Sequence, residues 1–236
     1  MSLIAGSYER FIWGYKLRHP KPTSGGNQTR TLTPLFSYAA HLSPVKSVAV
    51  AGPVGASAAG DDSVKLYDLS ACSELGSVLL HDSASVTSLA FFTPPCLSSF
   101  PRNLLAGADD GSVCIFDVDP FVLLKTVPVH KKAINDLAVH PSGRLGLTVS
   151  RDSHLAMVNL VRGRRSFFCR LEKEASIIKY SSDGGRFFMA SQAKITVHEA
   201  EDARIIGELE SAKRVLCAAP GEVGFSLFVM NWFTGY

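Results

Sequence analysis

Five copies of one sequence pattern predict an all-β fold, an open or incomplete β-propeller with about five blades present. In each copy a strand-like run ends at a tight turn, and a second strand closes on an aromatic or apolar residue followed by a polar one. The copies cover residues 3–16, 55–68, 103–117, 145–159 and 186–199. From the second copy on, their last residues, Asp68, Asp117, Asn159 and Glu199, lie 49, 42 and 40 residues apart. A period of roughly 40–50 residues that contains strands is typical of four-stranded propeller blades.

The individual strands follow from the alternation of apolar and polar residues. VKLYD at 64–68 and VCIFD at 113–117 have period two and contain β-branched and aromatic residues, as half-buried strands require. A short strand of small apolar residues precedes each pair and suits the crowded innermost position near a propeller axis. These inner strands are expected at 45–50, 85–91, 133–140 and 176–181. The sequence shows no helical period of useful length, so every element is expected to be β.

The strands divide the chain into one partial propeller over residues 1–220 and an atypical tail over 221–236. Blades are expected near 3–40, 41–80, 81–129, 130–170 and 171–210, and a sixth starts at 211–220. The first blade begins at its second strand and lacks the inner one. The tail contains no aspartate turn and no second strand pair, which sets it apart from the repeats.

Composition indicates an ordered globular protein and excludes several functional classes. Hydrophobic residues make up 46% of the chain and charged residues 19%. The net charge of +3 is too small by itself to indicate binding to nucleic acid or membranes. The five cysteines are scattered and never spaced CxxC, which predicts reduced thiols in a cytosolic or nuclear protein. With no phosphate-binding loop, dinucleotide fingerprint or zinc-ligand spacing, we expect no cofactor, no metal, no small-molecule substrate and no catalysis.

A histidine precedes the turn aspartate in three of the copies. The pairs are His41 with Asp61, His81 with Asp110 and His130 with Asp152, separated by 20, 29 and 22 residues. Such residues can act as metal ligands or as general acids and bases. The three pairs occupy equivalent turns in different blades, so they are too far apart to form one site, and we interpret them as structural. A buried carboxylate needs hydrogen-bond donors, and the imidazole N–H supplies one at a fixed place.

The same arrangement resembles the WD-repeat family, in which a histidine before the blade hydrogen-bonds the turn aspartate. The tryptophan that names the repeat is replaced here by Tyr67, Phe116 and Val158. A closer resemblance rests on LIAGSYERFIWGY at 3–15, AGADDGSVCIFD at 106–117 and the long block at 130–168 that contains HPSGRLGLTVSRD and NLVRGR. These segments are similar to the p21-activated protein kinase-interacting proteins. The likeness implies a C-terminally truncated member of a family of seven-bladed propellers.

What that resemblance implies about function is a non-catalytic scaffold in large (60S) ribosomal subunit biogenesis and rRNA processing, located in the nucleus and nucleolus. The implied partners are pre-60S ribosome assembly factors and p21-activated kinase, whose signalling the protein would restrain, with weak or indirect rRNA contact and no membrane. The alternative is a generic WD-repeat adaptor in another complex, such as substrate recognition for a ubiquitin ligase. An enzyme would need titratable groups that converge on the central channel of the propeller. The inner strands are expected to place only Asp136 and Lys179 there, as isolated charges.

One basic run is the candidate contact with a partner or with RNA. It contains Arg162, Arg164 and Arg165, with Arg170 and Lys173 beyond them. Guanidinium groups suit phosphate because their planar fork donates two parallel hydrogen bonds. Phe167 and Phe168 could then stack on bases. The competing interpretation is a solvated loop beside an outer strand, with both phenylalanines in the core.

Overall fold

The computed structural model describes residues 2–18, 31–80, 84–94, 100–220 and 227–230, which form antiparallel β-sheets. The first sheet has three strands, β1 (Ser2–Gly6), β2 (Phe11–Arg18) and β3 (Thr31–Ala39). The second contains β4 (Val45–Ala51), β5 (Val54–Ala59), β6 (Ser63–Asp68) and β7 (Ser73–Leu79). The third contains β8 (Val86–Phe92), β9 (Asn103–Ala108), β10 (Ser112–Val118) and β11 (Phe121–Pro128). The fourth contains β12 (Ile134–Val139), β13 (Leu145–Ser150), β14 (His154–Asn159) and β15 (Arg164–Arg170). The fifth contains β16 (Ile177–Tyr180), β17 (Arg186–Ser191), β18 (Lys194–Glu199) and β19 (Ile205–Glu210).

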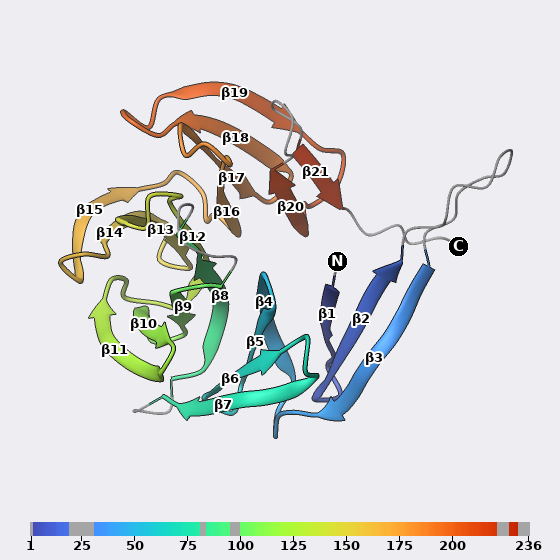
Figure 1. Ribbon diagram of the computed structural model, residues 1–236. Coiled ribbons are helices and arrows are strands. Elements are labelled where there is room, and N and C mark those ends of the chain that lie inside the picture. The colour runs from blue at the N-terminus through green and yellow to red at the C-terminus, as the bar shows by residue number, and fades with distance from the viewer. Residues whose placement is uncertain (1, 19–30, 81–83, 95–99, 221–226, 231–236) are drawn as a thin grey trace, which may run out of the picture.

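Each of these five sheets is one propeller blade, and the blades are arranged around an arc that does not close into a ring (Figure 1). Blades 2 to 5 run from an inner strand to an outer one in sequence order, because each strand pairs with its neighbour in the chain. Within the described residues there is no helix, and so none that could span a bilayer. The prediction of an all-β fold, an open propeller with about five blades, is therefore confirmed.

The C-terminal segment differs from the sequence expectation. A sixth sheet pairs β20 (Cys217–Pro220) with β21 (Leu227–Met230), so part of the tail forms a second strand although it carries no aspartate turn. Residues 221–226 and 231–236 of the predicted tail lie outside the described residues, as does His81. At the other end, blade 1 contains three strands, as its sequence predicts.

The core lies between the faces of neighbouring blades. Leu66 of blade 2 packs in one cluster with Leu104 and Phe116 of blade 3, and all three are fully buried. Separate clusters join blades 3 and 4 and blades 4 and 5, and a smaller one joins blade 5 to β20. Because each blade buries apolar area against the next blade, the hydrophobic effect stabilises the stack as a whole.

Polar side chains on the inner strands also join consecutive blades. The backbone N–H of Leu89 in β8 donates to Ser47 Oγ of β4 at 3.0 Å. Two blades further on, the N–H of Ile178 in β16 donates to Asp136 Oδ2 of β12, also at 3.0 Å. In both contacts the acceptor belongs to the preceding blade. These bonds fix the register of one inner strand against the next, which apolar contacts alone leave loosely specified.

Asp136 and Lys179 are not isolated charges, contrary to the sequence interpretation. Lys179 Nζ lies 2.6 Å from Asp136 Oδ2, and Ser88 Oγ donates to Asp136 Oδ1 at 2.9 Å. One carboxylate thus contacts blades 3 and 5 from its place on blade 4. The sequence interpretation failed because these partners lie 43 and 48 residues from Asp136 and meet only when the blades stack.

Candidate functional site

In blade 2, His41 and Asp61 belong to a buried hydrogen-bonded network. His41 Nδ1 lies 3.2 Å from Asp61 Oδ1, and its Nε2 lies 2.7 Å from Ser57 Oγ, which in turn lies 2.8 Å from the hydroxyl of Tyr67. Ser63 Oγ donates to Asp61 Oδ1 at 2.7 Å. One assignment of donors and acceptors satisfies these hydrogen bonds: Tyr67 donates to Ser57, Ser57 donates to the imidazole, and the neutral imidazole donates to the carboxylate.

The electrostatics of this network agree with a neutral histidine and an ionised aspartate. Burial lowers the pKa of His41 below its ordinary value, although the carboxylate of Asp61 works in the opposite direction. For Asp61, burial raises the pKa, but hydrogen bonds from Ser63 and from the N–H of Leu42 outweigh burial and leave the pKa lowered. Burial also raises the pKa of Tyr67, so its hydroxyl stays protonated and can donate.

Blade 4 repeats this arrangement with a different hydroxyl. His130 Nδ1 lies 3.2 Å from both oxygens of Asp152, and its Nε2 lies 2.9 Å from Thr148 Oγ1. Asp152 also accepts the backbone N–H groups of Lys131 and His154, each at 3.1 Å. Burial lowers the pKa of His130. Burial also raises the pKa of Asp152, but the hydrogen bond from the N–H of Lys131 and the interactions with His130 outweigh it and leave that pKa lowered.

Two of the three predicted pairs are thus brought together, and the third is left open. Asp110 accepts the N–H of Ser112 at 2.8 Å, while its expected partner His81 lies outside the described residues, so that pair stays a prediction. No group of three or more His, Cys, Asp or Glu residues that could hold a metal ion is found in the part of the chain that the structure describes.

The hydroxyl residues of these networks were not identified from the sequence. Another hydroxyl of the same strand, that of Ser150, instead donates to the backbone carbonyl of Lys132 at 2.9 Å. The hydroxyls that complete the networks are Ser57 and Thr148, each four positions before its turn aspartate. That shared offset is the signal in the sequence that would have identified them.

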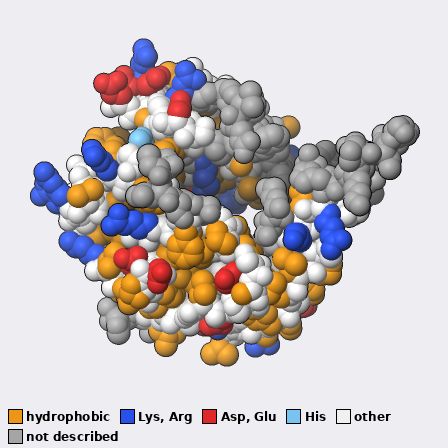
Figure 2. All heavy atoms as spheres, viewed as in Figure 1, with side chains coloured by type: hydrophobic (Ala, Val, Ile, Leu, Met, Phe, Trp, Pro, Cys, Tyr) orange, Lys and Arg blue, Asp and Glu red, His pale blue; other side chains and the backbone are white. Residues whose placement is uncertain are grey.

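The predicted contact residues lie along the outer strand of blade 4. We call the basic edge the exposed set formed by Arg162, Arg164, Arg165, Arg170 and Lys173, which follows the β14–β15 turn and β15. Figure 2 shows Lys and Arg side chains gathered on the left of the view, where β11 and β15 lie in Figure 1. Among the described residues, no ion pair is found for Arg162 or Arg164.

Arg165 differs from its two neighbours because it joins blades 3 and 4. Its Nη1 donates to the carbonyl of Val129 at 2.7 Å, and its guanidinium lies 4.4 Å from the ring centroid of Phe168. Phe168 in turn stacks on His154, with centroids 4.3 Å apart and planes within 12°. Phe167 and Phe168 keep 47% and 37% of their surface exposed, so neither lies in the core.

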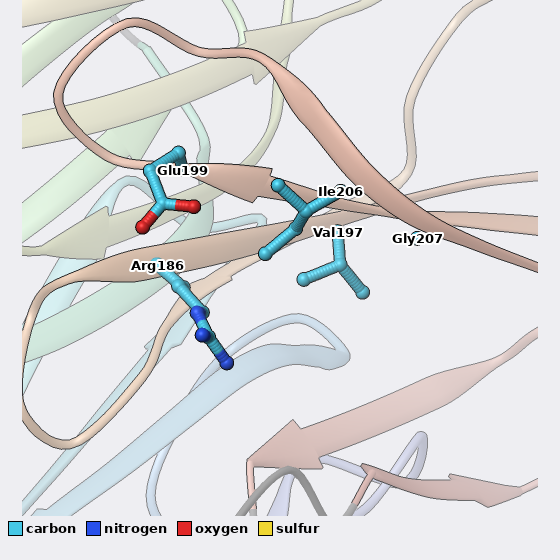
Figure 3. Close-up of a pocket in the computed structure, with 5 residues that line it drawn as sticks. All are labelled: Arg186, Val197, Glu199, Ile206 and Gly207. Atoms are coloured by element: carbon cyan, nitrogen blue, oxygen red, sulfur yellow. The ribbon is translucent and has the colours of Figure 1, made fainter.

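The fifth blade has a shallow hollow on its surface. Its volume is about 340 Å³ and its described lining is Arg186, Val197, Glu199, Ile206 and Gly207. Figure 3 shows Val197 and Ile206 projecting into it, with Glu199 and Arg186 toward one end. Within this described lining, one carboxylate and one guanidinium on neighbouring strands do not form a converging acid–base or nucleophilic group.

The repeat family and the relatives agree with this architecture. The WD domain, G-beta repeat family (WD40) matches residues 73–117 and 121–157. The chain is 33% identical to a chicken (Gallus gallus) p21-activated protein kinase-interacting protein 1-like, over 91% of this chain and 54% of the relative. It is 33% identical to human p21-activated protein kinase-interacting protein 1, over 91% and 53%. It is 25% identical to yeast (Saccharomyces cerevisiae) Protein MAK11, over 91% and 55%.

The chain therefore spans about half the length of the curated relatives it matches. The chain contains WD40 repeats within residues 73–157 and is similar, over about 91% of its length, to p21-activated protein kinase-interacting proteins.

Proposed function

We propose that this protein is a non-catalytic scaffold that takes part in maturation of the large ribosomal subunit, in the nucleolus. The sequence resemblance implies this role, and the structure supports it through a rigid arc of blades that presents loops and edges in fixed geometry.

The observation that carries the proposal is the exposed basic edge of blade 4. Arg162 and Arg164 lie at the β14–β15 turn with exposed side chains, and Phe167, further along β15, is 47% exposed. Exposed guanidiniums bind phosphate, and an exposed aromatic ring can stack on an unpaired base. A preribosomal particle offers both, so the basic edge is a surface for contact with its RNA.

The test compares two substitutions that remove positive charge from the same strand region. Arg162→Ala with Arg164→Ala is expected to weaken co-sedimentation with large-subunit precursor particles and to reduce the salt dependence of that binding. The thermal unfolding midpoint should stay unchanged because neither guanidinium has an ion-pair partner among the described residues. Unchanged particle binding would contradict the proposal.

Arg165→Ala is the matched control. It removes the same charge but also the bond to the Val129 carbonyl, so it should lower the unfolding midpoint. A fluorescent fusion of the chain should concentrate in the nucleolus, and uniform cytosolic fluorescence would count against the proposal as a whole.

A second candidate function is restraint of p21-activated kinase signalling. The observation that favours it is that several relatives, 30–33% identical over about 91% of this chain, are p21-activated protein kinase-interacting proteins by name. The test is co-precipitation of purified chain with the regulatory segment of such a kinase. Binding that survives in the Arg162→Ala, Arg164→Ala variant would separate this function from the RNA contact.

A further inference from the structure

The turns that join the third and fourth strands carry acidic residues on blades 2, 3 and 5 and basic residues on blade 4. These turns lie at one end of the blades, which we call the turn rim. The acidic residues are Asp68 on blade 2, Asp117 and Asp119 on blade 3, and Glu201 and Asp202 on blade 5. Blade 4 carries Arg162 and Arg164 at the same place. The basic edge therefore begins between the acidic turns of blades 3 and 5, and a partner attracted to an acidic turn is repelled at the turn of blade 4.

Between blades 2 and 3 the acidic part of the turn rim surrounds a hollow of about 380 Å³. The deeply buried side chains of Val54 and Val118, 1% and 5% exposed, belong to its lining. Leu75 and Phe100 line it while keeping 50% and 37% of their surface exposed. Apolar side chains that line a hollow and remain in water are typical of a binding site for a partly apolar ligand.

The aromatic wall of this hollow is held in place by both blades. Phe121 lines it and lies 5.6 Å from Phe116, centroid to centroid. On blade 2, a Cβ built on Gly76 would lie 3.3 Å from a ring carbon of Phe121, so the ring packs directly over that glycine. A wall that is already ordered loses little conformational entropy when a ligand binds.

Two carboxylates belong to the same lining, Asp68 from blade 2 and Asp119 from blade 3. Asp68 Oδ1 accepts the N–H groups of Ser70 and Ala71 at 2.7 and 3.0 Å, which fixes its orientation. Asp119 is exposed. Across the residues that the structure describes, neither carboxylate forms an ion pair, and no cation is part of the lining.

We propose that this hollow, formed by blades 2 and 3, is a docking site for an extended basic peptide of a protein partner, which inserts an arginine or lysine beside an apolar side chain. The methylene stem of the basic side chain contacts the apolar lining, and its charged end reaches Asp68 and Asp119. An arginine also stacks on the exposed aromatic surface of Phe100 or Phe121. A basic peptide is the ligand that charge complementarity favours, because Asp68 and Asp119 repel nucleic acids and acidic peptides.

The test measures binding of a short fluorescein-labelled peptide of alternating arginine and leucine to the whole chain, by fluorescence anisotropy. A peptide of alternating glutamate and leucine is the charge control. Asp119→Asn should raise the Kd of the arginine peptide about two- to fivefold, as expected for loss of one exposed ion pair. Leu75→Ser should also raise the Kd, because it removes exposed apolar lining without changing charge.

Glu201→Gln is the matched control variant, since it removes one exposed carboxylate from the equivalent turn of blade 5. It should leave the Kd unchanged. Equal weakening by Asp119→Asn and Glu201→Gln would overturn the proposal by showing nonspecific attraction, as would an unchanged Kd in Leu75→Ser or equal binding of the glutamate peptide. Both lining positions are exposed, and unchanged melting curves confirm that each variant is folded.

Discussion

Replacing Asp152 by alanine tests the central structural interpretation, that the His–Asp networks hold each blade turn against the strand before it. The side chain of Asp152 is 8% exposed and that of His130 is fully buried. Without the carboxylate, the Nδ1–H of His130 is left buried with no acceptor, which costs about 1–3 kcal/mol. The N–H groups of Lys131 and His154 also lose their acceptor, at about 0.5–1.5 kcal/mol each.

These contributions give an expected loss of about 4 kcal/mol in the free energy of unfolding. For a chain of this size, 1 kcal/mol shifts the melting temperature by about 2–4 °C, so the variant should melt about 8–16 °C lower. The assay is thermal unfolding followed by circular dichroism, with urea unfolding to confirm the direction. Asp152→Asn keeps one acceptor oxygen and should lose clearly less.

The double variant His130→Phe, Asp152→Ala isolates the pair from its surroundings. If the buried imidazole is the main cost, removing it together with the carboxylate should cost much less than the two single losses added together. Additive losses, or a melting temperature of Asp152→Ala within about 2 °C of the unmodified chain, would refute the interpretation of the turn.

Three further outcomes are expected from the same contacts. The pKa values of His41 and His130 lie below the ordinary 6.5, so the unfolded chain takes up protons first as the pH falls. The free energy of unfolding should therefore be highest above about pH 6.5 and decrease below it. A urea midpoint at pH 5.5 equal to that at pH 7.5 would contradict this. Asp136→Ala should lower the free energy of unfolding by about 2–4 kcal/mol, measured by urea unfolding. The reason is that hydrogen-bond donors of two neighbouring blades, including Lys179, lose their acceptor. A loss under about 0.5 kcal/mol would show that the blades stack without this carboxylate. Arg165→Ala should lower the melting temperature by a few degrees, since one charge-assisted bond contributes about 1.5–3 kcal/mol, whereas no change would return this residue to the free basic surface.

The fold was predictable because its signals are local and repeated. The alternation in 64–68 and 113–117 sets each strand, and the turn aspartates recur at a nearly constant step. The pairs of His41 with Asp61 and His130 with Asp152 were found for the same reason, since each member occupies the same place in its copy.

The rest depends on which face of a strand a residue occupies and on which blade lies next to it. Ser57 and Thr148 could not be identified from the sequence because the strand pattern does not tell whether a hydroxyl residue lies on the buried or on the exposed face. Asp136 and Arg165 could not be interpreted because their partners come from other blades. Arg165 and Arg164 carry the same charge and are adjacent in the sequence, and only the hydrogen bond from Arg165 to the carbonyl of Val129 distinguishes them.

The polar contacts between inner strands have a direction, which affects how the chain folds as it is synthesised. Ser47 accepts from Leu89, and Thr87 Oγ1 donates to the carbonyl of Ile134, so in each case the earlier segment offers a side chain and the later one a backbone group. During translation the amino-terminal part emerges first. The inner strands β8, β12 and β16 each meet a hydrogen-bonding side chain of the preceding blade that is already in place, so these blades can assemble stepwise from the amino end.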